Sequence, residues 1–183
     1  VRYEEKHYGE GNGTGGKVLN PVTNIYVGEN SVFTLDTAQI KGVDSTIRTS
    51  KAVLSKGAKL VIKERLMTHG KQKATSIYEV ELKGEFSNAD VISRSVAKDY
   101  SNQSFEANII GANICNGHAE CDAIIMDQAR VLSIPKLDAR HVDAMLIHEA
   151  AIGKIAGEQL IKLMTLVLTE KEAEECIVNG FLK

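Results

Sequence analysis

The chain has 183 residues, with 22 Lys and Arg against 24 Asp and Glu and a formal charge of −2. Its hydrophobic share of 43% and charged share of 25% are those of an ordinary globular domain. The near balance of charge argues against a broad basic face, so we expect no nucleic-acid partner. No run approaches the ~20 apolar residues that span a bilayer, so we expect no membrane partner either.

Cysteine usage and the first residues bear on localisation. Three cysteines in a chain of this length do not make a disulfide framework. The sequence begins at Val1 with polar residues and shows no apolar signal region. We therefore expect a cytoplasmic protein.

Residues 1–22 are polar and rich in glycine, and we predict a loop or tail there. The stretch Gly11–Lys17 satisfies G-x-x-x-x-G-K, the pattern of a phosphate-binding loop. That loop needs a Ser or Thr after the lysine, and Val18 stands there instead. It also needs a buried strand before it and a helix after it. We interpret the stretch as a flexible segment.

Residues 23–154 are predicted to form a core of short strands separated by regular turns. Glycines in polar clusters recur at a nearly constant spacing: Gly28, Gly42, Gly57, Gly70 and Gly84. A fixed period is typical of repeat architectures, and two strands and two turns per coil give about 28 residues. The turns of antiparallel sandwiches usually recur every ~8–12 residues, which is closer than the turns seen here. The spacing therefore favours a mainly β fold, a parallel β-helix (β-solenoid), over an antiparallel meander.

Residues 155–183 are predicted to form two short helices. Gly157 opens the first, and apolar positions follow it at helical spacing. Thr169 and Glu172 match a capping box at the start of the second. Cys176 falls on the predicted apolar face, where we expect core packing. Two such helices cannot bury their apolar faces on each other alone, so we expect them to cap the solenoid or to contact a partner.

Two clusters carry candidate metal ligands. Cys115, His118 and Cys121 lie within seven residues, and thiolate and imidazole suit zinc, copper or iron–sulfur clusters. On a straight strand His118 points away from the two cysteines, whereas a turn at Asn116-Gly117 unites all three. Buried thiols with a polar histidine are the alternative. The second cluster, His148-Glu149, is a buried pair or a ligand pair.

The sequence from residue 94 to the end resembles the SufB/SufD family of iron–sulfur cluster assembly proteins. The segments that carry the resemblance are Gly117–Ile125, Ser133-Ile134-Pro135, Leu146–Ile155, Glu158-Gln159-Leu160 and Ile177–Phe181. The repetitive segment before residue 94 fits the same family less sharply. The chain is similar to the C-terminal portion of a SufB-like member.

The resemblance implies a right-handed parallel β-helix with a C-terminal helical segment. It implies a scaffold, not an enzyme, that receives sulfur and iron and passes on a labile iron–sulfur cluster. Cys121 matches the family's cluster or sulfur-accepting cysteine, and His148-Glu149 matches its histidine–glutamate pair near the subunit interface. Cys115 and His118 match no common ligand of the family and stay local candidates.

The implied partners are a SufC-like ABC-type ATPase that docks on the C-terminal helices, and a second subunit. Because Cys121 and His148 coexist here, that subunit is either a SufD-like protein or a second copy of this chain. The alternative function is a metal-free β-solenoid interaction module. Replacing Cys121 by Ala separates the two readings, because only the scaffold needs the thiol.

Overall fold

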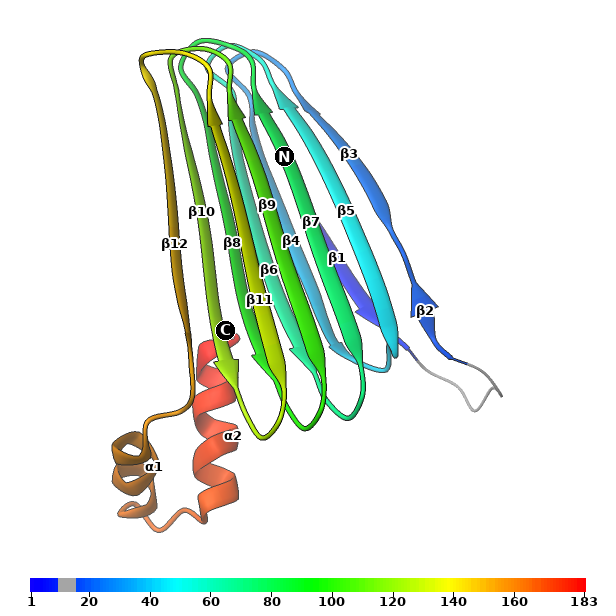
Figure 1. The fold of residues 1–183 in the computed structure, drawn as a ribbon, viewed down its shortest axis with the longest axis vertical. Coiled ribbons are helices and arrows are strands. Elements are labelled where there is room, and N and C mark those ends of the chain that lie inside the picture. Colours follow the sequence, from blue (N-terminus) through cyan, green and yellow to red (C-terminus); the bar gives the residue numbers. More distant parts are fainter. Residues whose placement is uncertain (10–15) are drawn as a thin grey trace.

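The computed structural model describes residues 1–9 and 16–183, which form a parallel β-solenoid of about five turns followed by two helices (Figure 1). Two parallel sheets face each other. Sheet A contains β1 (Arg2–Tyr8), β4 (Val32–Lys41), β6 (Lys59–Thr68), β8 (Ser87–Ala97), β10 (Cys115–Ile125) and β12 (Ala144–Gly153). Sheet B contains β2 (Val18–Leu19), β3 (Val22–Val27), β5 (Ser45–Leu54), β7 (Lys73–Leu82), β9 (Asn102–Gly111) and β11 (Arg130–Ala139).

The register of the strands confirms the predicted coil. In sheet A, Ser87 at the start of β8 pairs with Cys115 at the start of β10, and Cys115 pairs with Ala144 at the start of β12. In sheet B, Ser45 at the start of β5 pairs with Lys73 at the start of β7. Each step along a sheet therefore spans two strands and two turns of the chain. Each coil contributes one strand to each sheet, and the mainly β, parallel solenoid predicted from the glycine spacing is correct.

The turn glycines are needed where successive coils stack closely. Gly57 has a φ of 64°, in the left-handed region that side chains rarely adopt, and its N–H donates to the Glu85 carbonyl at 2.8 Å. A Cβ on Gly84 would lie 2.1 Å from the backbone nitrogen of Lys56. Gly57 and Gly84 thus lie where the turn of one coil contacts that of the next.

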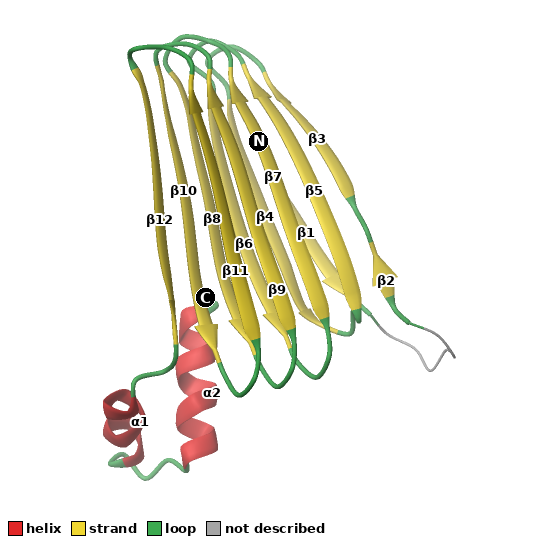
Figure 2. Ribbon diagram, viewed as in Figure 1, coloured by secondary structure: helices red, strands yellow, loops and turns green. Residues whose placement is uncertain are grey.

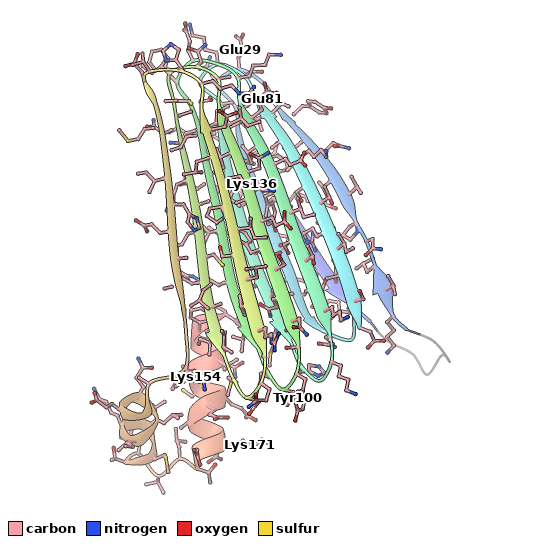
Figure 3. All side chains as sticks on the ribbon, in the orientation of Figure 1. Glu29, Glu81, Tyr100, Lys136, Lys154 and Lys171 are labelled. Atoms are coloured by element: carbon pink, nitrogen blue, oxygen red, sulfur yellow. The ribbon has the colours of Figure 1, made fainter. Side chains whose placement is uncertain are left out.

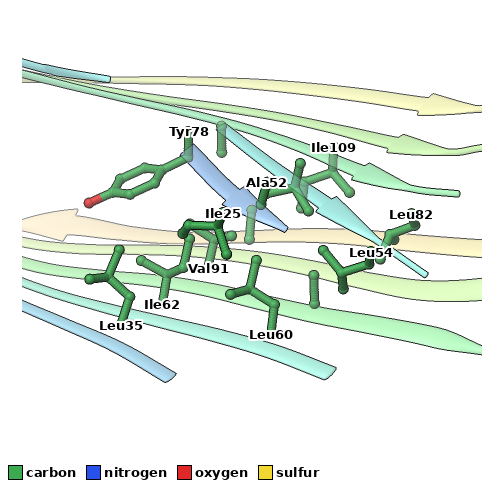
Figure 4. Packing of buried hydrophobic residues seen from close by; sticks show 14 of the residues in the cluster. Ile25, Leu35, Ala52, Leu54, Leu60, Ile62, Tyr78, Leu82, Val91 and Ile109 are labelled. Carbon is green, nitrogen blue, oxygen red and sulfur yellow. The ribbon is translucent and has the colours of Figure 1, made fainter. Parts of the chain in front are cut away.

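The interior of the solenoid has an apolar part and a polar part. Figure 4 shows the apolar part, in which aliphatic side chains from both sheets interdigitate around Leu54, Leu60, Leu82, Val91 and Ile109. Toward the C-terminal ends of the sheet A strands and the N-terminal ends of the sheet B strands, buried hydroxyl, amide and charged side chains replace them. These are Thr37, Gln39, Thr46, Arg48, Ser50, Glu64, Thr68, Ser76, Ser93, Ser95, Ser101 and Gln103.

Glu64 is the centre of the largest cluster in the polar part. The carboxylate is 5% exposed and accepts hydrogen bonds from the hydroxyls of Ser76, Tyr78 (3.0 Å) and Ser93 (2.7 Å). Burial and then the charge of Glu64 raise the pKa of Tyr78 well above its usual value. The phenol therefore stays protonated and donates, which a buried carboxylate requires.

The structure corrects the prediction of a loop or tail over residues 1–22. Within that range, Arg2–Tyr8 forms β1, which pairs in parallel with β4, and Val18–Leu19 forms β2. The inward side chains of β1 are polar because they meet a buried guanidinium. Arg48 contacts Glu5 at 3.0 Å and His7 at 2.7 Å. Most of the segment that resembles a phosphate-binding loop lies outside the described residues.

The C-terminal part forms the two predicted helices, α1 (Gly157–Met164) and α2 (Glu170–Phe181), coloured red in Figure 2. Thr169 caps α2 with the predicted capping box. Val178 and Leu182 pack with Val96 of β8, which fixes α2 on sheet A. Neither helix in the described part of the chain is long and apolar enough to cross a membrane.

The expected core position of Cys176 is wrong. Its side chain is exposed, whereas Ala173 and Val178 are the buried residues of α2. The remainder of the predicted apolar stripe is largely kept, because Ala173 is buried and Phe181 packs with Val178 and Leu182 against Val96. The contact with β8 therefore shifts the buried face only enough to leave Cys176 outside it.

Candidate functional site

The candidate residues lie on the last two strands of sheet A. Cys121 is on β10, and His148 and Glu149 are on β12, which pairs in parallel with β10. Sheet A ends at β12 and sheet B ends at β11, so β11 and β12 form the last turn of the solenoid among the described residues. We call it the open turn, because no further strand covers it there. Inner side chains of this last turn are less covered than elsewhere, with Leu137 40% and Ile152 38% exposed.

Cys121 points into the solenoid. Its register neighbours are Ser93 on β8 and Ala150 on β12, and only 1% of its surface is exposed. Burial raises the pKa of the thiol, the charges of Glu64 and Asp122 raise it further, and the hydroxyl of Ser133 on β11 partly opposes the rise. The free chain therefore holds Cys121 as a thiol at neutral pH, and a metal must displace a proton to bind it.

His148 lies on the same inner face. It pairs with Ala119, two residues before Cys121, so the imidazole and the thiol are diagonal neighbours on adjacent strands. Its Nδ1 atom is buried and has no hydrogen-bond partner among the described residues. Ser133 Oγ, which lies beside the Cys121 thiol, is also buried and makes no hydrogen bond of normal geometry to the described residues. Leaving a buried polar atom unpaired costs about 1–3 kcal/mol, so a ligand that bonded to either atom would recover part of that free energy.

Glu149 lies on the opposite face of the sheet, because neighbouring residues of a strand point to opposite sides. Its carboxylate is 3.7 Å from His118 Nε2, and Asp90 of β8 is 3.6 Å from His118 Nδ1. The two carboxylates thus flank opposite edges of one imidazole. No group of three metal-ligating side chains forms in residues 1–9 and 16–183.

The Cys115, His118 and Cys121 cluster does not come together. All three lie on the straight strand β10, with the cysteines inward and His118 outward. Cys115 and Cys121 are six residues apart, which at ~3.3 Å per residue separates them by about 20 Å. Burial also raises the pKa of the Cys115 thiol. Cys115 is a packing residue, as one of the two alternatives predicted.

The structure therefore divides the predicted site. Cys121 and His148 share the inner face of the open turn, and Glu149 joins His118 on the outer face. Sequence reasoning missed Ser133 and Glu64 as neighbours of the thiol. The alternation Leu60, Ile62, Glu64 carries the signal for the second, because it places Glu64 on the inward side of β6.

The described residues therefore form a parallel β-solenoid whose last turn holds a buried thiol and a histidine whose Nδ1 has no hydrogen-bond partner among them. The sequence comparisons then give the family. Residues 16–181 match the profile described as "SUF system FeS cluster assembly, SufBD core domain". The chain belongs to the SufBD family.

Curated relatives carry the same description. An iron–sulfur cluster assembly SufBD family protein of Methanocaldococcus jannaschii is 31% identical over 98% of this chain and 57% of its own length. One from Pyrococcus horikoshii is 31% identical over 100% of this chain and 55% of its own length. A Methanothermobacter thermautotrophicus relative is 37% identical over 56% of this chain and 26% of its own length. The chain spans about half, or less, of the length of these relatives.

Proposed function

We propose that this chain is a scaffold subunit on which an iron–sulfur cluster is assembled as cargo and from which it is transferred. The cluster binds at the inner face of the open turn, with Cys121 and His148 as ligands. The observation that carries the proposal is the buried, unpaired Nδ1 of His148 diagonal to the Cys121 thiol in the described part of the chain. Family membership supports iron–sulfur chemistry for this pair.

The chemistry suits cargo rather than a resident centre. A stable iron–sulfur cluster commonly has four cysteine ligands, whereas this turn supplies one thiol and one imidazole. Binding releases the Cys121 proton, and reprotonation of the buried thiol favours release. The chain itself performs no catalytic turnover in this proposal. Its residues bind, shield and release the cargo.

A second subunit completes the ligand set. Among the described strands, β11 and β12 each have one neighbour in their sheet and leave a free edge beside the thiol and the imidazole. Free strand edges accept further strands, so a second copy of this chain or a SufD-like protein adds its own ligands there. Glu149, on the outer face, takes no part in this inner group.

The C-terminal helices support an ATPase partner. α1 buries none of its residues, and Ile161 (64%), Leu166 (68%) and Val167 (94%) are exposed on it or just after it. We propose that a SufC-like ABC-type ATPase covers this apolar surface. Replacing Leu166 and Val167 by Ser is expected to abolish co-purification with that ATPase, while the fold, measured by circular dichroism, stays intact. Undiminished co-purification would contradict this docking surface.

The test of the scaffold is anaerobic reconstitution with Fe²⁺ and sulfide, read by visible absorption. The parent and Cys176→Ala are expected to develop a charge-transfer band, because Cys176 lies far along the chain on α2 and is exposed. Cys121→Ala is expected to lose the band, and His148→Ala to weaken it. Urea midpoints for each variant separate ligand loss from unfolding. An equal band in Cys121→Ala would refute the site.

The same experiment decides the second candidate function, a metal-free interaction module. The exposed apolar surface around α1 favours it, since that surface needs no metal. A chain that binds the ATPase, forms its dimer and yet never develops a band would support the module. Loss of the band in Cys121→Ala with ATPase binding retained would support the scaffold.

A further inference from the structure

A basic pocket lies on the outer face of sheet A, beside the C-terminal end of α2, whereas the candidate cluster site lies on the inner face of the same sheet. Its volume is about 320 Å³, and residues of β1, β4, β6, β8 and the chain end line it. The cations of its lining are Arg2, Lys63, Arg65, Arg94 and Lys183. This concentration is unusual in a chain whose formal charge is −2.

The two carboxylates of the lining are already engaged. Asp36 accepts a hydrogen bond from Arg2 Nε at 2.8 Å. Glu64 is directed inward, where three hydroxyls donate to it. Neither is available to the remaining cations. Lys63, Arg65 and Arg94 have no ion-pair partner within 4 Å in the described part of the chain.

The register of β6 and β8 places two of these cations directly opposite each other. Arg65 pairs with Arg94 on the same outer face. Like charges that are directly opposite across strands destabilise a sheet. Asp122 lies opposite Arg94 in the next strand, and Glu120, two residues before it, feels the charge of Arg94; neither carboxylate forms an ion pair with Arg94 in the described residues. Lys183 follows the C-terminal end of α2, where the helix dipole favours a cation. The cations of the lining that have no ion-pair partner among the described residues and no helix end beside them are Lys63, Arg65 and Arg94.

We propose that this pocket binds a multiply charged phosphate-bearing anion of about the size of a diphosphate. Arginine presents planar pairs of N–H donors that match phosphate oxygens, and two adjacent guanidiniums grip one phosphate group from two sides. The volume lies at the lower end of small-ligand pockets. The described lining contains no aromatic ring for a base to stack on, so the phosphate group is what the pocket recognises.

Isothermal titration calorimetry with pyrophosphate tests the proposal. The matched variants are Arg65→Gln/Arg94→Gln in the pocket and Lys51→Gln/Lys136→Gln on sheet B, where Lys136 lies on β11 (Figure 3). Both remove two positive charges. The pocket variant is expected to bind pyrophosphate at least about tenfold more weakly, equivalent to ~1.4 kcal/mol, and the control within about twofold of the parent. Circular dichroism checks that all variants fold.

Thermal melting supplies an independent measurement. Pyrophosphate is expected to raise the Tm of the parent and of the sheet B control. Arg94→Gln is expected to raise the Tm without ligand, because it relieves the repulsion with Arg65, and to lose most of the rise with pyrophosphate. ADP shows whether a nucleotide diphosphate is accepted as well as the free anion, and either result supports the proposal.

Two outcomes overturn it. If both double variants lose the same affinity, the attraction is one of overall charge and not of this pocket. If citrate, which also carries several negative charges but lacks phosphate geometry, binds as tightly as pyrophosphate, the pocket does not recognise phosphate. Absence of measurable pyrophosphate binding to the parent at low salt refutes the proposal directly.

Discussion

Replacing Glu64 by Leu is expected to destabilise the solenoid strongly. The substitution removes the acceptor of three buried hydroxyls, on Ser76, Tyr78 and Ser93, which are 3%, 1% and 2% exposed. Each donor left without a partner costs about 1–3 kcal/mol. Removal of the desolvated charge offsets part of that sum. We expect a net loss of about 4 kcal/mol, a large fraction of a typical stability of ~5–15 kcal/mol.

Glu64→Gln is the matched control. Its amide oxygen still accepts from two hydroxyls, and its amide nitrogen donates to the third, because a hydroxyl is both donor and acceptor. We expect this variant to lose less than about 1.5 kcal/mol, the net contribution of one ordinary hydrogen bond. Urea denaturation followed by far-ultraviolet circular dichroism measures both variants, with equal m-values as the check on two-state unfolding. Equal stability of the Leu and Gln variants would refute the argument from hydroxyl satisfaction.

Three further predictions concern the cysteines, the helix cap and the core. Iodoacetamide is expected to alkylate exposed Cys176 first and Cys121 only slowly. Labelling of Cys121 faster than Cys176 at neutral pH would contradict this order. Because burial raises the pKa of Cys121 in the folded chain, the stability that the buried thiol contributes is complete below its unfolded pKa and is lost as pH rises through its folded pKa. Thr169→Ala is expected to cost about 1 kcal/mol in urea unfolding and to raise the lowered pKa of Glu172 part of the way to its usual value, because the backbone N–H of residue 169 still donates to that carboxylate whereas the hydroxyl is lost; an unchanged Glu172 titration by NMR would contradict this. Gly117→Ala is expected to lower the free energy of unfolding by about 1–2 kcal/mol, since its Cβ would lie 2.8 Å from core methyl groups. A more stable variant in urea unfolding would contradict this and show that the neighbouring side chains rearrange to make room.

The N-terminal strand shows how local sequence can mislead. The segment Arg2–Tyr8 has polar residues on both faces and carries no alternation of hydrophobicity. It is a strand because β4 offers an edge and because Glu5 and His7 meet the buried Arg48. Both conditions come from residues in later coils, far away along the chain. Periodicity within a window cannot show them.

The candidate site shows the same limit at the level of single residues. Cys121 and His148 stand out in the sequence, yet whether they share a face depends on the register of β10 against β12. A shift of one residue would turn every side chain of β12 to the other side. That register places His148 inward beside Ala119 and directs Glu149 outward to His118. Adjacent residues in sequence thus serve different surfaces.

The sequence by itself determined the architecture of this protein. The regularly spaced turn glycines and the capping box at Thr169 act over a few residues, so their effects are legible in the chain. The tertiary structure alone decided the register of β10 against β12, the buried face of α2 and the polar network around Glu64. It also decided the opposition of Arg65 and Arg94. These features depend on the register between the strands of successive coils. The side chains that set this register are about 28 residues apart in the sequence, so no local pattern contains them.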